Sequence, residues 1–190
     1  MGRASAHSSS GGRILTGIAG WSYADWAGIV YPTRRSRDFH ELTYLAEYFD
    51  TIEINTSFYQ PLRPALAEQW IQQAARNPRF TFTAKLWRRF THETGATAAD
   101  ERAARQGFAP LVNTGKLGAL LLQFPHSFHN TPENWATLKA LLARFADFPL
   151  VVEVRHNSWN HGDFFALLNE HQTGFCNLDQ PQLGRTLAPS

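Results

Sequence analysis

Six short apolar segments, each with a polar residue near its end, alternate with helical segments along this sequence. A chain of this kind folds into a mainly parallel sheet, because parallel neighbours need a crossover connection and a helix supplies it. The alternation therefore predicts an α/β fold. The expected strands are residues 13–20, 51–55, 80–85, 117–125, 149–156 and 173–180.

Five helices are expected between these strands from the spacing of their apolar residues. Capping residues, proline in the first turn and glycine behind the last turn indicate where each helix starts and stops. The expected helices are residues 37–50 with Asp38 as cap, a helix starting at Pro64, residues 98–114 with Gly115 behind them, a helix starting after Thr131, and residues 162–172 stopping at Gly174.

Two architectures fit this alternation, an open doubly wound sheet and a TIM-type (β/α) barrel. A nucleotide-binding doubly wound sheet has a glycine-rich turn after its first strand, whereas here Gly17 and Gly20 are followed by the bulky Trp21. A barrel instead directs several polar strand ends into one mouth. Such residues recur from Glu53 to Asp179 at intervals of 26 to 38 residues, which suit one βα unit. The pattern favours the barrel.

The composition indicates one globular domain. The chain has 190 residues, 43% of them hydrophobic, and a net charge of +2 that gives little support for a nucleic-acid partner. No run of about 18 apolar residues suggests a membrane partner. A single cysteine, Cys176, excludes an internal disulfide and suits the cytoplasm. Residues 1–12 are small and polar, and we expect a flexible N-terminal tail there.

The second strand carries polar side chains on one face only. Thr51, Glu53 and Asn55 alternate with Ile52 and Ile54, and successive strand residues point to opposite faces. Isoleucines suit the face that packs against helices. We therefore expect the polar face to look into the mouth of the barrel.

The polar strand ends together predict a site for acid–base chemistry. Three carboxylates crowded with Lys85 and Arg155 at low dielectric cannot all keep ordinary pKa values, and such clusters suit proton transfer. The alternative is structural, with Glu53–Lys85 and Glu153–Arg155 as buried ion pairs that fix the fold. The residues predicted to be catalytic are Glu53, Lys85, Glu153 and Asp179.

Nine further residues are predicted to bind substrate. Guanidinium groups hold phosphate or carboxylate in pairs of hydrogen bonds, and Arg88 and Arg89 either extend such a pocket or form a solvated loop. Aromatic rings behind the strand ends either stack on a sugar or base or cover the upper core. The predicted binding residues are Trp21, Ser22, Asn55, Tyr59, His92, Gln123, Arg155, His156 and Trp159.

Other candidate residues are expected to be structural. Trp26 and Tyr31 are assigned to covering the core. Cys176 lies three residues before Asp179, on the opposite face by strand parity, and is expected in the core rather than as a nucleophile.

The histidine pattern predicts no metal site. None of the eight histidines forms a tight ligand pair, and the cofactor is left open. The fold analogy alone leaves one possibility, a cation held by Glu53, Glu153, Asp179 and His156. The loop histidines, expected to be caps or surface residues, are His126, His129 and His161.

Six ordered segments resemble successive motifs of the YecE-like family, also called domain of unknown function 72. They are "GIAGWSYADWAGIVYP", "FDTIEINTSFYQP", "FTFTAKLWRRFTHE", "LLLQFPHSF", "VVEVRHNSW" and "NLDQP". The resemblance implies a TIM-type barrel of bacterial, cytoplasmic character and no secure activity. The matching polar residues are Trp21, Ser22, Tyr23, Glu53, Asn55, Tyr59, Lys85, His92, Gln123, Glu153, Arg155, His156, Trp159 and Asp179.

One departure from the family pattern concerns the end of the chain. Family members continue past the D-x-P motif into two further strands that line the same mouth, whereas this sequence stops at Ser190. The resemblance therefore implies that residues 13–190 form a YecE-like barrel domain truncated after the sixth strand, with about six of the eight βα units. Open first and sixth strands would leave the chain poorly stable alone or would drive self-association.

Three functions are compatible with these residues. The first is an enzyme for an anionic or hydroxylated small molecule, such as one that bears phosphate or carboxylate, with a carboxylate as base and Lys85 or Arg155 stabilising developing charge. The second is a metal-dependent phosphodiesterase or nucleic-acid-processing enzyme. The third is a non-catalytic ligand-binding module.

Overall fold

The computed structural model describes residues 12–179 and contains one parallel sheet whose six strands follow one another in sequence order. Within this described range, no strand lies on the other side of the first strand, as one does in a doubly wound sheet. The predicted tail and everything after residue 179 lie outside the described residues, apart from Gly12. The strands are β1 (Gly17–Ala19), β2 (Thr51–Ile54), β3 (Thr81–Lys85), β4 (Leu117–Gln123), β5 (Leu150–Glu153) and β6 (Gly174–Phe175), which confirms the α/β prediction.

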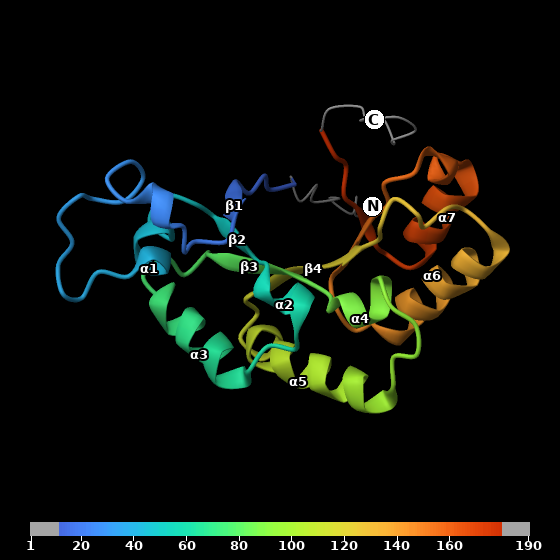
Figure 1. Cartoon of the computed structure of the whole chain (residues 1–190), viewed down its shortest axis with the longest axis horizontal. Helices are drawn as coiled ribbons and strands as arrows, with labels where there is room; N and C mark the ends of the chain where they lie inside the picture. Colours follow the sequence, from blue (N-terminus) through green and yellow to red (C-terminus); the bar gives the residue numbers. More distant parts are fainter. Residues whose placement is uncertain (1–11, 180–190) are drawn as a thin grey trace, which may run out of the picture.

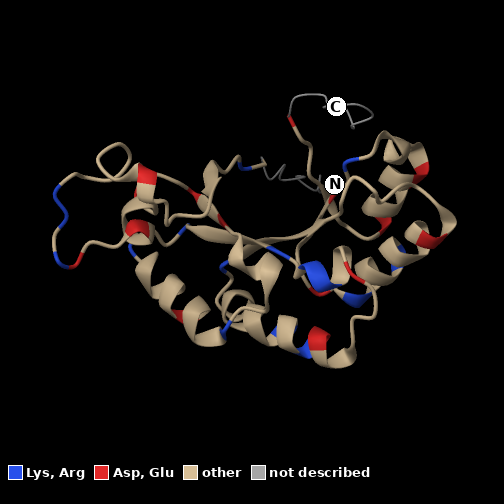
Figure 2. Cartoon of the chain, viewed as in Figure 1, with Lys and Arg blue, Asp and Glu red and all other residues tan. Residues whose placement is uncertain are grey.

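The helices lie along the outer side of this curved sheet (Figure 1). Charged residues are spread over these helices and their loops, while the sheet is largely uncharged (Figure 2). The α-helices are α1 (Glu41–Leu45), α2 (Thr56–Tyr59), α3 (Pro64–Gln73), α4 (Arg88–Thr91), α5 (Ala98–Asn113), α6 (Pro132–Arg144) and α7 (Gly162–Glu170), and the 3-10 helices are η1 (Ala24–Trp26) and η2 (Asn157–Trp159).

Alternation along the strands separates the core from the site. Ile52 and Ile54 of β2 are buried, as are Phe82 and Ala84 of β3, and they belong to the core that packs under the helices. Their neighbours on the opposite face of the sheet are only partly buried, and Glu53 is one of them. The sheet therefore presents its polar residues on the side away from the helices.

Three of the five expected helices begin where capping chemistry places them. Pro64 opens α3, and Thr131 caps α6 by accepting a hydrogen bond from the Asn134 backbone N–H. Thr97 caps α5, and Gly115 behind that helix has a φ of +65°. This left-handed conformation is the one in which glycine ends a helix.

Two helix ends differ from the prediction. His40, not Asp38, caps α1, because its Nδ1 accepts a hydrogen bond from the Leu42 backbone N–H at 3.3 Å. Helix α7 ends at Glu170, and Gln172 takes the left-handed conformation with a φ of 50°. Gly174 is therefore the first residue of β6 and not the stop of the helix.

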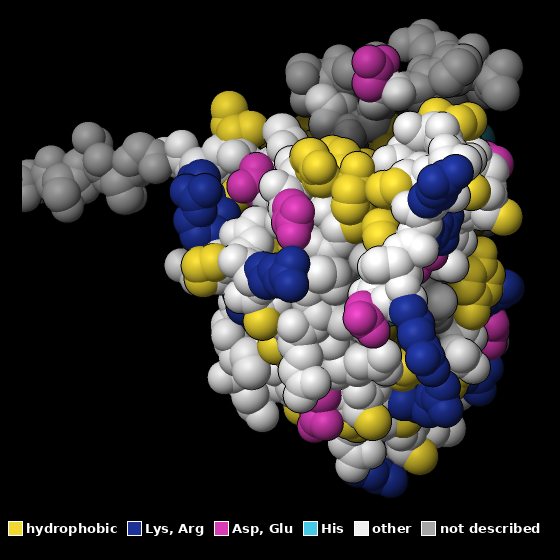
Figure 3. Space-filling view, turned by 90° about the vertical axis from the view of Figure 1, so that its left-hand side faces the viewer, with side chains coloured by type: hydrophobic (Ala, Val, Ile, Leu, Met, Phe, Trp, Pro, Cys, Tyr) yellow, Lys and Arg dark blue, Asp and Glu magenta, His cyan; other side chains and the backbone are white. Residues whose placement is uncertain are grey.

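Figure 3 views the end of the molecule that lies at the left of Figure 1, and hydrophobic and charged side chains are mixed over this face. The two aromatic residues expected to cover the core, Trp26 and Tyr31, do pack against it. Tyr31 is only 2% exposed, and Trp26 packs against the core with partial exposure.

Candidate functional site

Two ion pairs form at the carboxyl ends of the strands. Lys85 at the end of β3 lies 3.4 Å from Glu53 of β2, measured from Nζ to Oε1. Glu153 at the end of β5 is only 3% exposed, and Arg155 Nε donates to its Oε1 at 2.9 Å. Gln123, its register partner on β4, donates to both carboxylate oxygens at 2.8 and 2.9 Å. We call these five residues the strand-end cluster.

Cys176 also belongs to this side of the sheet, which corrects the sequence expectation. Phe175 pairs in register with Val152, and the Cys176 backbone N–H donates to the Val152 carbonyl, so the next position lies beside Glu153. Burial raises the pKa of the Cys176 thiol, and the nearby charges of Glu153 and Glu53 raise it further. The thiol therefore lies near both ion pairs and stays protonated.

Asp179 does not join the strand-end cluster. The prediction assumed that the sixth strand runs through Asp179. Strand β6 ends at Phe175, so strand alternation does not apply between Cys176 and Asp179. The Asp179 side chain is exposed and takes part in neither ion pair of the cluster. The structure thus gives Cys176 the place that the sequence analysis gave to Asp179.

Ser57 joins the ends of β2 and β3 and was missed by the sequence analysis. Its hydroxyl donates to the Ile54 carbonyl at 2.9 Å and accepts from the Lys85 backbone N–H at 3.1 Å. It is 1% exposed. A serine three residues beyond a strand carries no sequence signal for this role, which depends on how α2 folds back over the strand ends.

His92 lies at the edge of the site, directly after α4. Its Nδ1 is 2.8 Å from the Thr91 hydroxyl, and its ring meets Phe58 edge-on. Partial burial of the imidazole lowers the pKa of His92, and the charges of Arg88 and Arg155 lower it further. The ring is accordingly neutral at neutral pH.

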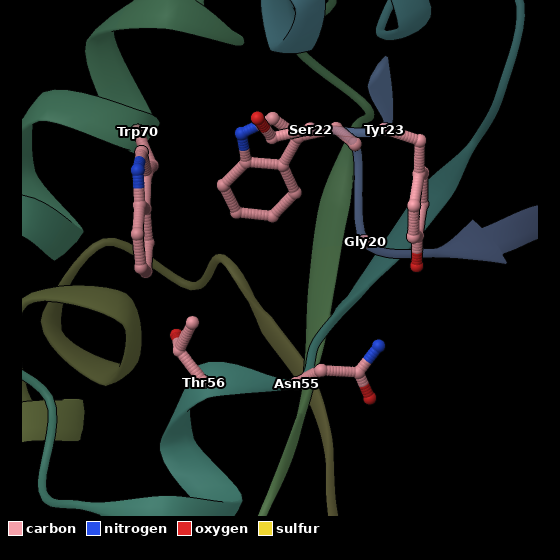
Figure 4. Close-up of a pocket in the computed structure, with 7 residues that line it drawn as sticks. Gly20, Ser22, Tyr23, Asn55, Thr56 and Trp70 are labelled. Atoms are coloured by element: carbon pink, nitrogen blue, oxygen red, sulfur yellow. The ribbon is translucent and has the colours of Figure 1, made fainter. Parts of the chain in front are cut away.

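Trp21, Ser22 and Asn55 line a separate hollow of about 350 Å³ next to the sheet. Gly20 turns the chain into it with a φ of 72°, which a side chain would strain. We call this hollow the tryptophan pocket (Figure 4); its lining residues are Gly20, Trp21, Ser22, Tyr23, Asn55, Thr56 and Trp70. Thr56 and Trp70 were not among the predicted binding residues.

Trp159 is a core residue, so its predicted contact with a ligand is wrong. It is 0% exposed, and its Nε1–H donates to the Phe128 carbonyl at 2.7 Å. Four nearly parallel rings form a column here. The stacked neighbours, with their centroid distances, are Phe124–Phe128 (4.1 Å), Phe128–Trp159 (5.3 Å) and Trp159–Trp135 (5.5 Å).

The remaining predicted residues lie on the rim. Tyr59 is 69% exposed on α2 and touches Phe58. His156 caps η2 by accepting from the Ser158 backbone N–H, and its ring stacks on His129 at 3.9 Å. His161 caps α7, as expected for a loop histidine.

The two arginines of α4, which follows β3, form ion pairs with acidic neighbours. Arg88 and Arg89 both pair with Glu93, at 3.1 Å each, and Arg89 also lies 3.6 Å from Asp100. These contacts favour the structural interpretation of the two arginines over an anion pocket.

Neither a metal centre nor a membrane span is found in residues 12–179. Within that range, no three histidine, cysteine, aspartate or glutamate side chains gather as they would around a metal ion. No helix of the described part combines the length and apolar character needed to cross a bilayer.

Known proteins resemble this chain along nearly its whole length. The UPF0759 protein YunF of Bacillus subtilis (strain 168) is 28% identical over 189 residues, which cover 93% of this chain and 64% of YunF. The UPF0759 protein YecE of Escherichia coli (strain K12) is 26% identical over 181 residues, covering 93% of this chain and 59% of YecE. The chain thus spans about three fifths of the length of these relatives.

Solved structures show the same fold. A DUF72 family protein from Thermotoga maritima MSB8 superposes with a TM-score of 0.73 at 26% identity, covering 91% of this chain and 67% of the other. A DUF72 family protein from Enterococcus faecalis V583 gives a TM-score of 0.72 at 23% identity, covering 91% and 65%. Residues 15–189 match the family described as "Protein of unknown function DUF72", and the chain therefore belongs to the DUF72 family.

Proposed function

We propose that the chain contributes the site of a TIM-type (β/α) barrel enzyme that acts on an anionic or hydroxylated small molecule. Support for the barrel comes from the parallel sheet in sequence order and from the helices along one side of it. Barrel enzymes carry their catalytic residues at the carboxyl ends of the strands. The strand-end cluster occupies that position.

The observation that carries the proposal is the presence of uncommitted cationic donors beside fixed carboxylates. Lys85 Nζ has three hydrogens and, among the described residues, pairs only with Glu53. Arg155 uses Nε for Glu153, while its two terminal nitrogens have no partner within residues 12–179. A guanidinium edge and an ammonium group on the same side of the sheet can bind phosphate, carboxylate or a developing oxyanion.

The carboxylates of the cluster have different roles in this proposal. Glu153 is buried and held by both Gln123 and Arg155, so it orients the arginine. Glu53 has one ion-pair partner among the described residues, and its side chain is 23% exposed, which leaves it able to accept a proton from a substrate. His92 is a second proton acceptor. Its pKa lies below the ordinary value, so its ring is neutral and has a nitrogen free to take up a proton.

The proposal is tested by measuring the binding of anionic probes to variants in which one charged side chain of the cluster is replaced by a neutral one. Thermal shift and calorimetry with inorganic phosphate, citrate, gluconate and glycerol phosphate should reveal a ligand for the unmodified chain. Lys85→Met should weaken its binding by about tenfold or more, because a charge-assisted hydrogen bond is lost. Glu53→Gln should retain binding and remove turnover of any substrate found.

Glu93→Gln provides the matched control, since Glu93 pairs with Arg88 and Arg89 on the rim and outside the cluster. It should bind like the unmodified chain. If a folded Lys85→Met variant binds every probe as tightly as the unmodified chain does, the cluster is a structural ion-pair network and the proposal is wrong.

A further inference from the structure

We infer that the tryptophan pocket is a subsite for a neutral hydroxylated ring, of the pyranose kind. The inference deepens the proposed function and rests on it for the link to catalysis. It names the class of group that a substrate would carry next to its reacting end. The binding of the ring itself does not require the strand-end cluster.

The pocket combines apolar walls with unengaged polar groups. Within residues 12–179, the indole N–H groups of Trp21 and Trp70 and the side chains of Ser22, Asn55 and Thr56 make no hydrogen bond to protein. By contrast, the buried Trp159 N–H is satisfied by a carbonyl. In Figure 4 the Thr56 side chain points toward the Trp70 ring, with Ser22 on the opposite wall. An apolar hollow with several free hydrogen-bonding groups suits a ring that carries hydroxyl groups along its edge.

The ring geometry favours a pyranose over a flat base. The Trp21 and Trp70 rings meet at 82° with centroids 5.1 Å apart, so they form a corner and not a parallel slot. A base is stacked best between parallel rings, whereas a pyranose needs one aromatic face for its C–H side and donors for its edge. No charged residue lines the pocket, which fits a neutral ring.

The backbone of Trp21, one side of this corner, is fixed by a buried tyrosine. Tyr31 is 2% exposed, and its hydroxyl donates to the Trp21 carbonyl. Burial, followed by the charge of Glu41, raises the pKa of Tyr31 to about 12, so the hydroxyl remains a donor. The subsite is therefore preorganised, which lowers the cost of ligand binding.

The pocket adjoins the strand that carries Glu53. The Gly20 backbone N–H donates to the Glu53 carbonyl at 2.9 Å. Asn55 lies two residues beyond Glu53, and in Figure 4 its amide points away from Trp70. A ring seated against the tryptophans thus lies beside the end of β2, the strand that carries Glu53.

Indole N–H resonances in NMR titrations of the full chain provide the test. The chain has six tryptophans, and single Trp→Phe variants assign their signals. Methyl glucoside, methyl mannoside and N-acetylglucosamine at millimolar concentration should shift the Trp21 and Trp70 signals in a saturable way. The signal of buried Trp159 should stay fixed. Adenosine and cytidine, titrated in parallel, should produce smaller shifts.

Two substitutions locate the binding. Trp70→Leu should weaken glycoside binding by about tenfold, because the stacking face is lost. Thr56→Val changes an exposed side chain with almost no change in shape and should weaken binding by about threefold or more, even if Trp70→Leu folds poorly. The matched control is Trp135→Phe, which changes the aromatic column and should leave binding unchanged.

The outcomes separate this inference from the proposed function. Glycoside shifts that persist in Lys85→Met support the subsite even if no anion binds the cluster. The subsite is refuted if no glycoside shifts the Trp21 and Trp70 signals, if a nucleoside shifts them while glycosides do not, or if Thr56→Val and Trp70→Leu bind glycosides as well as the unmodified chain.

Discussion

The imidazole of His92 lies among charged groups of both signs at the edge of the site. Arg88 and Arg155 disfavour its protonated form, and Glu93 and Glu153 oppose them, while partial burial decides the direction. The folded pKa therefore lies below the ordinary value of 6.5. Between these two values the unfolded chain binds more protons than the folded chain. The contribution of neutral His92 to the stability of the fold is therefore fully present above pH 6.5. It is lost as the pH falls through the folded pKa, because protonation then favours the unfolded chain.

The prediction at this scale concerns acid sensitivity. In His92→Gln the side chain is neutral at every pH, so the midpoint of thermal unfolding should fall less between about pH 7.5 and about pH 5.5 than in the unmodified chain. Circular dichroism melts measure this difference. His171→Gln, at the end of α7, is the control and should not reduce the sensitivity. Equal sensitivity in His92→Gln and the unmodified chain would contradict the prediction.

Single residues also show what strand alternation can and cannot predict. Glu53 and Lys85 lie inside regular strands, and their shared face was predicted from alternation alone. Cys176 and Asp179 lie beyond the end of β6, where alternation no longer holds. Trp159 is the last residue of the 3-10 helix η2, which directs it into the core. Where a strand stops is determined by pairing with its neighbour, which the local sequence does not contain.

At the level of elements, the starts of helices with strong local signals were predicted, whereas α1 was predicted with the wrong cap. Helix α5 begins with a capping box, in which Thr97 accepts from the Asp100 backbone N–H and Asp100 accepts from the Thr97 backbone N–H. Hydrogen bonds from Thr97 lower the pKa of Asp100. The five-residue helix α1 begins with His40 instead, a residue with no strong capping preference. Its start depends on tertiary packing.

The prediction for α5 follows from its capping box. Thr97→Ala removes one half of the box and should lower the free energy of unfolding by about 1 kcal/mol, measured by urea denaturation. Thr94→Ala, an exposed threonine in the loop before the helix, should change it by less than about 0.5 kcal/mol. If both variants lose the same stability, the cap is not responsible.

For the molecule as a whole, the feature with a consequence for assembly is the pair of outer strands of the sheet. Within the described residues, β1 pairs only with β2 and β6 only with β5. Unpaired backbone groups on an edge strand are a template for pairing with another chain. We propose that copies of this chain associate through these edges.

The Ala19→Pro substitution tests this association. Thr16 and Gly20 direct their backbone groups to β2, so alternation directs the N–H of Ala19 away from it. Proline there removes an outward donor and leaves the ladder to β2 intact. Light scattering at increasing concentration should show self-association of the unmodified chain and less of it in Ala19→Pro. A monomer at all concentrations, with a sharp thermal transition, would contradict the proposal.

The four-ring column at Trp159 has a consequence for how a ligand enters. The column packs three segments against one another, because Phe128 comes from the loop after β4, Trp159 from η2 and Trp135 from α6. Phe124, Phe128 and Trp159 are buried and Trp135 is partly buried, so we expect this side of the site to stay rigid when a ligand binds. Any widening of the entrance then falls to segments outside the column, and those segments would govern the residence time of a ligand.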